Sequence, residues 1–373
     1  MKNPFYTSGY IGAEYFCDRI DETQRLTQLL ENGNHVVLMS PRRIGKTGLI
    51  QHIFNQKELK KQYNTFLIDI YATKNLAEFT QQFGGTILKT LTGHGEKALK
   101  QFLRIASSLR ATMSFDQLGV PTWGVELGQA DAVQYTLDQI FEYIEKSDKP
   151  CIIAIDEFQQ ITRYPEKNVE ALLRTYIQHS RNSHFIFSGS ERSLLGQIFH
   201  SPARPFFAST SAFPLDVIPE DKYTEFILHH FRRGNKGISL EAIHRTYSLF
   251  GGTTWYIQKV MSTLFMLAEK GTTIQEEDVN KAIDQIITDE SMNYANILYF
   301  LTPRQKQLLT AISKEGQAKE IKGHKFIAKY KLPSPSTIQT SIKTLIEKQI
   351  VTENLGTYQV YDKFFSIWLN RTL

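Results

Sequence analysis

The stretch HVVLMSPRRIGKTGLI at residues 35–50 contains the residue types that bind phosphate groups in proteins. Gly45, Lys46 and Thr47 supply the end of the pattern G-x-x-x-x-G-K-[ST], whereas Ser40 stands at its first glycine. Main-chain N–H groups of such a loop enclose the β-phosphate, and the lysine contacts the β- and γ-phosphate oxygens. Because these donors belong to the backbone, serine is acceptable at position 40 if its φ stays negative. The candidate phosphate-binding residues are Ser40, Pro41, Arg42, Arg43, Ile44, Gly45, Lys46, Thr47 and Gly48.

An acidic pair, Asp156 and Glu157, ends the apolar run CIIAIDE at residues 151–157. Ligands of open α/β sheets gather at the carboxyl ends of the strands, so this pair should face the loop at residues 40–47. Asp156 would hold Mg²⁺ through water opposite Thr47, and Glu157 would orient or deprotonate the water that attacks the γ-phosphate of ATP. The alternatives are a basic turn between strand and helix for the loop, and a solvated acidic turn for the pair. Together the two motifs favour binding of ATP with Mg²⁺.

Five short apolar runs predict the strands of a sheet, and they lie at residues 35–40, 65–70, 151–157, 184–190 and 212–218. Each run is too short for a helix and rich in Ile, Val and Phe, and amphipathic stretches separate the runs. Such an alternation is typical of buried parallel strands, so we expect an α/β fold with a five-stranded parallel sheet and helices on both faces. Within residues 74–131, LAEFTQQFGGTILKTL indicates a helix, and SFDQLGVPTWGVEL indicates a turn-rich excursion or a hairpin.

The pattern changes after residue 219, where apolar residues recur only with helical spacing. The C-terminal part then predicts three helices followed by a hairpin, with Thr302 as the N-cap before Pro303. Ser336 would cap the third of these helices after Pro335. The chain is therefore expected to consist of an α/β part, a helical part and a C-terminal part.

Three motifs, SPRRIGKT, IIAIDEF and FIFSGSERSLL, together make this sequence resemble the archaeal-type AAA ATPases, which are relatives of the STAND NTPases. The resemblance spans most of the chain. It implies a P-loop NTPase core at residues 1–217, a helical lid domain at residues 218–297 and a winged-helix domain at residues 298–373. It further implies ATP hydrolysis, in which Lys46 and Glu157 are catalytic.

The N-terminal segment YFCDRIDE resembles this family's F-x-G-R-x-x-E box, which typically packs near the adenine. Phe16, Arg19 and Glu22 match the box, and Asp18 replaces its glycine. The resemblance therefore implies that Phe16 and Arg19 help to bind the nucleotide. An N-terminal helix with a surface ion pair between Arg19 and Glu22 is the alternative.

The segment HFIFSGSER resembles the family's sensor strand and implies that Ser188 or Ser190 lies near the γ-phosphate, with Arg192 on the following turn. For the serines, a helix cap is the alternative. The segment SPARPFF lies where the family carries an arginine before the last strand, so Arg204 is a candidate catalytic arginine finger, in cis or in trans. Its alternative is a surface loop arginine, and a finger in trans would require a homo-oligomer.

The segment LFGGTTWYIQKV resembles the G-x-P region of the family's helical lid. Thr253 or Thr254 stands in place of the proline. The alternative is that Gly251 and Gly252 simply begin a helix.

Positive charge is concentrated at the C-terminal end. Residues 301–373 hold 12 Lys and Arg against 5 Asp and Glu, or +7, whereas the remaining residues hold 31 against 33, or −2. The winged helix that this segment resembles would place its third helix, residues 336–348, in the major groove of DNA, with the wing near Gly356 on the backbone. Candidate contacts are Thr337, Gln339, Thr340, Lys343 and Thr344 on that helix, and Lys322, Lys325, Lys329 and Lys331 for phosphates. The helix has no arginine, so strong base-specific readout is not indicated, and contact with a protein is an equal alternative.

Other features bound the setting of the protein. Only Cys17 and Cys151 occur, so we expect reduced thiols rather than a disulfide framework or a zinc site. No apolar leader starts the sequence and no run approaches the roughly 18 apolar residues of a membrane span, so we expect a cytoplasmic location. The C-terminal YDKFFSIWL puts Phe364, Phe365 and Trp368 on one helical face, which favours core or interface over nucleic-acid stacking.

Two functions are compatible with these features. The first is an ATP-hydrolysing molecular switch that couples its Mg-ATP state to a basic winged helix, which binds DNA or a client protein. The second is a DNA-binding regulator whose nucleotide site is structural or vestigial.

Overall fold

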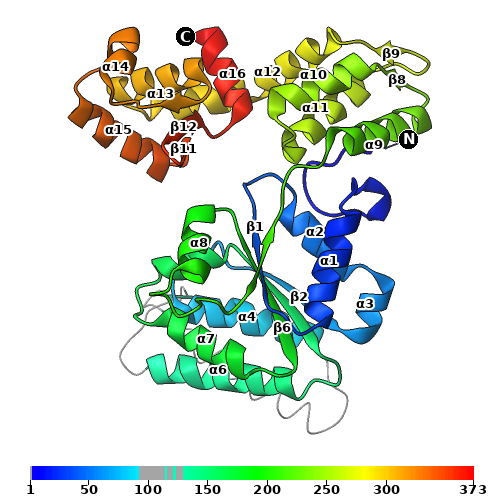
Figure 1. Ribbon diagram of the computed structural model, residues 1–373, viewed down its shortest axis with the longest axis vertical. Helices are drawn as coiled ribbons and strands as arrows, with labels where there is room; N and C mark the ends of the chain where they lie inside the picture. The colour runs from blue at the N-terminus through cyan, green and yellow to red at the C-terminus, as the bar shows by residue number, and fades with distance from the viewer. Residues whose placement is uncertain (1, 92–113, 116–120, 123–128) are drawn as a thin grey trace. The chain divides into compact units, whose positions relative to one another are not determined.

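The computed structural model describes residues 2–91, 114–115, 121–122 and 129–373 (Figure 1). The chain divides into two compact units. The sheet unit consists of Thr7–Tyr223 and Thr253–Trp255, and the helical unit of Met1–Tyr6, Thr224–Gly252 and Tyr256–Leu373. The finer division into three domains at residues 217 and 297 stays a prediction.

A parallel sheet forms the centre of the sheet unit (Figure 1). It has five strands in the order β2-β5-β6-β1-β7. Its strands are β1 (Val36–Met39), β2 (Asn64–Asp69), β5 (Cys151–Asp156), β6 (Ser183–Gly189) and β7 (Ser211–Pro214). All five overlap the apolar runs of the sequence. The predicted α/β fold with a five-stranded parallel sheet is therefore confirmed.

Helices cover both faces of this sheet (Figure 1). They are η1 (Ala13–Tyr15), α1 (Ile20–Glu31), α2 (Lys46–Phe54), α3 (Lys57–Gln62), α4 (Leu76–Thr90), α6 (Gln129–Glu145), η2 (Phe158–Arg163), α7 (Val169–His179) and α8 (Arg192–His200). Successive strand residues point to opposite faces, so Val36 and Leu38 pack with α1, α2 and α3. Val37 packs into the other core, with α4, α6, α7 and α8. Both faces are buried, which explains why the strands read as unbroken apolar runs.

The segment between α4 and α6 is described only in part. α4 coincides with the helix expected from LAEFTQQFGGTILKTL. β3 (Ser114–Phe115) pairs antiparallel with β4 (Pro121–Thr122), which is the hairpin alternative of the sequence. The rest of SFDQLGVPTWGVEL lies outside the described residues.

The helical unit contains helices with short strands between them. Its elements, two of which begin in the sheet unit, are α9 (Glu220–Arg233), β8 (Gly237–Ile238), α10 (Leu240–Phe250), α11 (Thr254–Leu267), β9 (Thr273–Ile274), α12 (Asp278–Tyr299), α13 (Pro303–Glu315), β10 (Ala318–Lys319), α14 (His324–Tyr330), α15 (Pro335–Glu347), β11 (Val351–Asn354), β12 (Thr357–Val360) and α16 (Lys363–Thr372). The strands β10, β12 and β11 form a small antiparallel sheet beside α13, α15 and α16. The predicted three helices and hairpin are therefore present, followed by α16.

The helix ends of this unit follow capping rules, with two corrections to the sequence analysis. Thr302 caps α13 in a full capping box with Gln305, as predicted for its role as N-cap. Ser334 is the N-cap of α15 and Pro335 its first residue, so Ser336 is not the cap. Proline favours the first helical position and holds the preceding residue extended, which places the cap before it. Gly251 ends α10 with a φ of 54°, so Gly251 and Gly252 do not begin a helix.

Contacts within the helical unit join α10 and α11 to the winged helix. The Tyr256 hydroxyl donates to the Tyr361 carbonyl at 3.2 Å and accepts from the Lys363 N–H at 3.0 Å. The Lys363 ammonium bonds the last carbonyl of α10, that of Phe250, at 2.7 Å. Phe364 and Phe365 are buried, and Trp368 packs against Phe365 and Tyr294, as expected of core residues.

Cys17 and Cys151 are free and buried. Among the described residues, no helix is both long and apolar enough to cross a bilayer.

Candidate functional site

The loop between β1 and α2 has the backbone shape that its residues allow. Ser40 is buried and its φ is not positive, which meets the condition for replacing the first glycine. Gly45 has a φ of 101°, a conformation that favours glycine, and it immediately precedes the first residue of α2, Lys46. Arg43 also has a positive φ, 67°. Positive and negative φ values therefore alternate along the loop, which turns successive N–H groups inward. Together with the N-terminus of α2, these N–H groups can bind an anion.

The Lys46 side chain lies in this loop. Its Nζ donates to the carbonyl oxygens of Ser40 at 3.2 Å and Pro41 at 3.0 Å, and the residue is 7% exposed. Burial lowers the pKa of the ammonium from 10.5 to about 8, although the carboxylates of Asp156 and Glu157 act in the opposite direction. A buried cation close to two carboxylates is suited to contact phosphate oxygens.

The carboxylate of Asp156 joins three segments at the end of the sheet. Oδ2 accepts from the Thr47 hydroxyl at 2.7 Å, Oδ1 accepts from the Ser188 hydroxyl at 2.7 Å, and Oδ1 also accepts from the Glu157 N–H at 3.0 Å. Asp156 is 7% exposed. Hydroxyl and carboxylate oxygens in this arrangement fit Mg²⁺, which binds one or two protein oxygens and completes its shell with water and phosphate.

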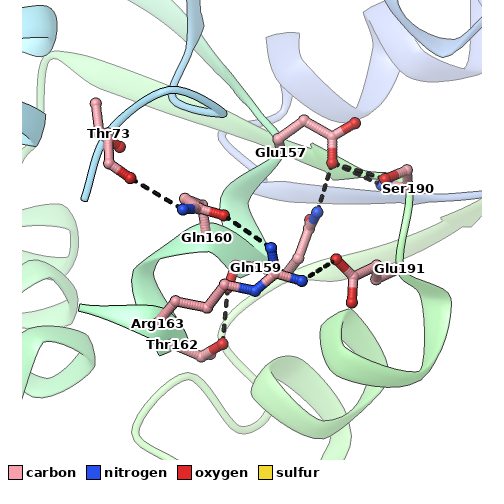
Figure 2. Close-up of polar contacts among 8 residues, drawn as sticks. All are labelled: Thr73, Glu157, Gln159, Gln160, Thr162, Arg163, Ser190 and Glu191. Carbon is pink, nitrogen blue, oxygen red and sulfur yellow. Dashed lines mark hydrogen bonds and ion pairs between the residues drawn. The ribbon is translucent and has the colours of Figure 1, made fainter. Parts of the chain in front are cut away.

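The Glu157 carboxylate is held by the turn after β6 and by η2 (Figure 2). Oε2 accepts from the Ser190 hydroxyl at 2.7 Å, the Ser190 N–H at 3.3 Å and the Gln159 side-chain amide at 2.5 Å. Glu157 itself has a positive φ of 57°. The structure thus gives each of the two serines of SGS one carboxylate, Ser188 to Asp156 and Ser190 to Glu157.

Phe16 lies against the start of α2. A side chain at Gly48 would meet its ring at 3.4 Å, so the absence of a Cβ there leaves room for the ring. The ring stacks on His52 with centroids 4.4 Å apart, and Tyr10 packs edge-on at 5.8 Å. Phe16 is therefore close to the phosphate loop, although whether it contacts a base stays a prediction.

Arg19 is buried rather than on the surface. It is 3% exposed, and its guanidinium pairs with Glu22 at 2.5 Å. It also donates to the carbonyl of Asp216 at 2.6 Å and to that of Ile44 in the phosphate loop at 3.5 Å. The ion pair between Arg19 and Glu22 that the sequence analysis gave as the alternative is present, but its arginine is buried. Arg19 also links the N-terminal segment to the loops that contain Ile44 and Asp216.

A second segment far along the chain contacts the same loop. Thr254 Oγ1 donates to the Ile44 carbonyl at 3.0 Å, and the Trp255 N–H donates to the Arg43 carbonyl at 3.1 Å. The Arg43 guanidinium lies over the Trp255 ring, 4.4 Å from its centroid. Thr254 and Trp255 belong to the segment that resembles the G-x-P region of the family. They bind the phosphate loop through its main-chain carbonyl groups.

The two candidate arginines differ in position. Arg192, the first residue of α8, is exposed and close enough to Lys46 for its charge to lower the pKa of that ammonium. Arg204 instead pairs with Glu170 of α7. Among the described residues, its contacts do not include Lys46, Asp156 or Glu157, so the structure does not bring Arg204 into the site.

Two site residues escaped the sequence analysis. Gln159 was not singled out, because a glutamine in a polar turn carries no distinctive signal, although its spacing of two from Glu157 could have drawn attention. His52 lies on α2 and stacks on Phe16, but a single histidine in a helix carries no motif. His52 contacts Phe16 from another segment of the chain, and Gln159 contacts Glu157 from the adjacent turn.

The winged helix presents a polar face on α15. A groove of about 620 Å³ beside it is lined by Thr302, Arg304, Gln305, Ser336, Thr337 and Thr340, among others. Some candidate lysines are already engaged: Lys329 pairs with Glu315 and Lys322 donates to Gln339. Lys325 and Lys331 are exposed, and neither pairs with a carboxylate in the described part of the chain.

The phosphate loop, the strand-end carboxylates and the parallel sheet define a P-loop NTPase. Residues 16–260 match the family described as "ATPase domain predominantly from Archaea", and residues 292–371 match the family described as "Probable winged helix domain". Since the first match covers more than half of the chain, the protein belongs to this archaeal ATPase family. The predicted family resemblance is confirmed, and so is the C-terminal winged helix.

Solved structures share the fold over nearly the whole chain. A Walker-type ATPase of Pyrococcus abyssi aligns with a TM-score of 0.64 at 19% identity, covering 98% of this chain and 99% of that one. The ORC2 protein of Aeropyrum pernix, in ADPNP and ADP complexes, gives 0.59 at 13% identity, covering 99% and 97%. The ORC1 protein of Aeropyrum pernix, in complex with DNA, gives 0.53 at 12% identity, covering 96% and 93%. None of the curated protein sequences compared with the chain matches it.

The burial of Arg19 leads to a stability prediction. Arg19→Ala leaves the Asp216 carbonyl without its side-chain donor and Glu22 without its partner, so it should lower the free energy of unfolding by about 2–4 kcal/mol. Arg25→Ala is the matched control, because Arg25 lies on the helix that Arg19 precedes and is exposed over the Phe213 ring, and it should cost less than about 1 kcal/mol. Denaturant unfolding of both variants tests this, and equal losses would contradict the structural role of Arg19.

Proposed function

We propose that this protein is an ATP-hydrolysing molecular switch whose nucleotide state acts on a DNA-binding winged helix. The observation that carries the proposal is the 2.7 Å contact between Thr47 of the phosphate loop and Asp156 at the end of β5. It brings a candidate phosphate-binding loop and a candidate metal-binding carboxylate together beside Lys46. The family of ATPase domains to which the chain belongs supports the same assignment.

In this proposal the residues divide the work of hydrolysis. The loop at residues 40–48 and the Lys46 ammonium bind the triphosphate, and Thr47 and Asp156 would hold Mg²⁺, which would supply positive charge for the β- and γ-phosphates. Glu157 orients a water molecule whose oxygen attacks the γ-phosphorus. The bond from that phosphorus to the β–γ bridging oxygen breaks, ADP leaves, and the water proton passes toward the Glu157 carboxylate and on to phosphate.

Arginine roles follow from position. Arg192, the exposed first residue of α8, is the candidate for sensing the γ-phosphate in cis. Arg204 would first have to leave Glu170, so its role as a finger, in cis or from a second copy of the chain, stays a prediction. Binding of the adenine near Phe16 and Arg19 stays a prediction, and so does a cytoplasmic location.

DNA is the partner that we propose for the winged helix. Its support is the +7 charge of residues 301–373, the exposed polar face of α15 and the DNA bound to the ORC1 protein of similar fold. Lysines that meet phosphates give a sequence-independent affinity that salt weakens. A protein client is the alternative outcome of the DNA test below.

Two substitutions separate nucleotide binding from chemistry. Lys46→Ala removes a charged hydrogen-bond donor and should weaken ATP binding about 10- to 100-fold. Glu157→Gln should leave the Kd of ATP within about threefold and lower kcat by about 10²- to 10⁴-fold. Calorimetry and phosphate release measure the two effects, with Lys61→Ala on exposed α3 as the control that changes neither. Equal turnover in wild type and both variants would exclude the assigned site.

The lowered pKa of Lys46 predicts how ATP affinity depends on pH. The charged ammonium is the form that binds phosphate, and its pKa of about 8 in the free protein means that it loses its proton as pH rises through that value. ATP affinity should therefore be constant below about pH 7.5 and fall up to tenfold per unit above about pH 8.5. Lys46→Arg keeps its charge at all these values and should give a flat profile, whatever its absolute affinity. A flat wild-type profile would argue against contact between Lys46 and the phosphates.

The DNA proposal predicts a salt-dependent affinity. A labelled duplex should bind with log Kobs falling linearly with log salt between about 50 and 200 mM. Replacing Lys325 and Lys331 by glutamine should lower the magnitude of that slope by about 2, whereas the same change at Lys57 and Lys61 should not alter it. Fluorescence anisotropy of the duplex with and without ATP measures the coupling between nucleotide binding and DNA affinity. Equal affinity in both conditions favours a DNA-binding regulator with a vestigial nucleotide site, and no binding at low salt favours a protein client.

A further inference from the structure

Gln159 occupies an unusual position beside the proposed catalytic carboxylate (Figure 2). It lies on η2, two residues after Glu157, and is only 2% exposed although it is a polar amide. Its Nε2 donates to Glu157 Oε2 at 2.5 Å. A buried amide that points its donor at a carboxylate fixes the orientation of that carboxylate.

The two oxygens of Glu157 have different surroundings. Oε2 receives three donors, the Gln159 amide and the hydroxyl and N–H of Ser190. In the described part of the chain, Oε1 makes no comparable bond with protein, and Glu157 remains partly exposed. One oxygen is therefore held by protein, and the other is left for water.

The arrangement is maintained at a cost. Gln159 Oε1 is buried and accepts no hydrogen bond from the described residues, which is unfavourable for a carbonyl oxygen. A Cβ at Gly189 would overlap this same atom and lie 3.1 Å from a methyl group of Leu195. Glu157 also adopts a positive φ that side chains rarely take. These three features make sense together if the placement of the amide serves the carboxylate rather than the core.

We propose that Gln159 is a positioning residue for ATP hydrolysis, which together with Ser190 holds Oε2 of Glu157 so that Oε1 faces the attacking water. Gly189 is the residue that admits the Gln159 amide to this position. The proposal rests on the proposed function, because it needs Glu157 to act on that water. Gln159 itself touches neither water nor nucleotide in this role.

The experiment compares Gln159→Met with Gln160→Met in the full-length protein. Methionine keeps the shape of glutamine and removes the donor. Gln160 is a matched control, because it is the next residue of η2 and its amide bonds the Thr73 carbonyl at 2.9 Å instead of Glu157 (Figure 2). Gln159→Met should lower kcat about 10- to 100-fold with the KM and Kd of ATP unchanged within about twofold. Gln160→Met should leave kcat within about twofold.

Two further variants keep the test decisive if Gln159→Met folds poorly. Gly189→Ala leaves Gln159 in the chain but displaces its amide, and Ser190→Ala removes one hydroxyl donor; each should lower kcat about tenfold at unchanged KM. In a Glu157→Gln background, Gln159→Met should change the residual rate less than twofold, because it acts through the carboxylate. A structural role would instead reduce ATP affinity or folding in both backgrounds.

The outcomes separate this proposal from the one on which it rests. Wild-type turnover that Gln159→Met and Gly189→Ala leave unchanged overturns the positioning role alone. A further loss of ten-fold or more on adding Gln159→Met to Glu157→Gln also overturns it. Absence of turnover in the wild type overturns the ATPase function and the positioning role together.

Discussion

The buried carboxylate of Asp156 is the point on which the site depends. It accepts hydroxyl hydrogen bonds from Thr47 at the start of α2 and from Ser188 near the end of β6, at 2.7 Å each. A carboxylate that is 7% exposed is stable only when such donors replace water. The parallel sheet supplies them, because β1 and β5 both lie next to β6 and their carboxyl ends meet at one edge. The site is therefore a consequence of strand order.

Much of this arrangement could be predicted from the sequence, because its signals are local. Runs such as VVLM and CIIAI contain β-branched residues and are apolar on both faces, so they identify buried strands without knowledge of their neighbours. Gly45 has a φ of 101°, which favours glycine, and Asp156 ends a strand. Short local patterns therefore predict both the phosphate loop and the acidic pair. Thr302 with Gln305 is likewise a pattern of four residues. In contrast, Ser334 and Ser336 both flank Pro335, and only the proline's own preference for the first helical position decides between them.

The side-chain positions that the sequence does not predict depend on contacts with other segments of the chain. Arg19 is buried by the Ile44 and Asp216 carbonyls, which no short pattern connects to it. Arg204 lies in a loop whose sequence predicts an arginine finger. It instead pairs with Glu170 of α7, which precedes β6 in the chain. Gln159 is local to Glu157, but its burial arises because β6 has a glycine at position 189. Hydrogen bonds of this kind leave no periodicity in the sequence.

The main-chain carbonyls of the phosphate loop accept hydrogen bonds from the residues that begin α11, and this bears on how a bound nucleotide could affect α11. The carbonyls of Arg43 and Ile44 accept from Trp255 and Thr254, the residues that begin α11. A ligand shifts an equilibrium only through groups that it contacts differently in two states. Phosphate would engage the N–H side of this loop, and any rotation of those peptides would move the carbonyls on the opposite side. Tyr256, the next residue along α11, belongs to the helical unit, where its hydroxyl bonds the Tyr361 carbonyl and the Lys363 N–H of the winged helix.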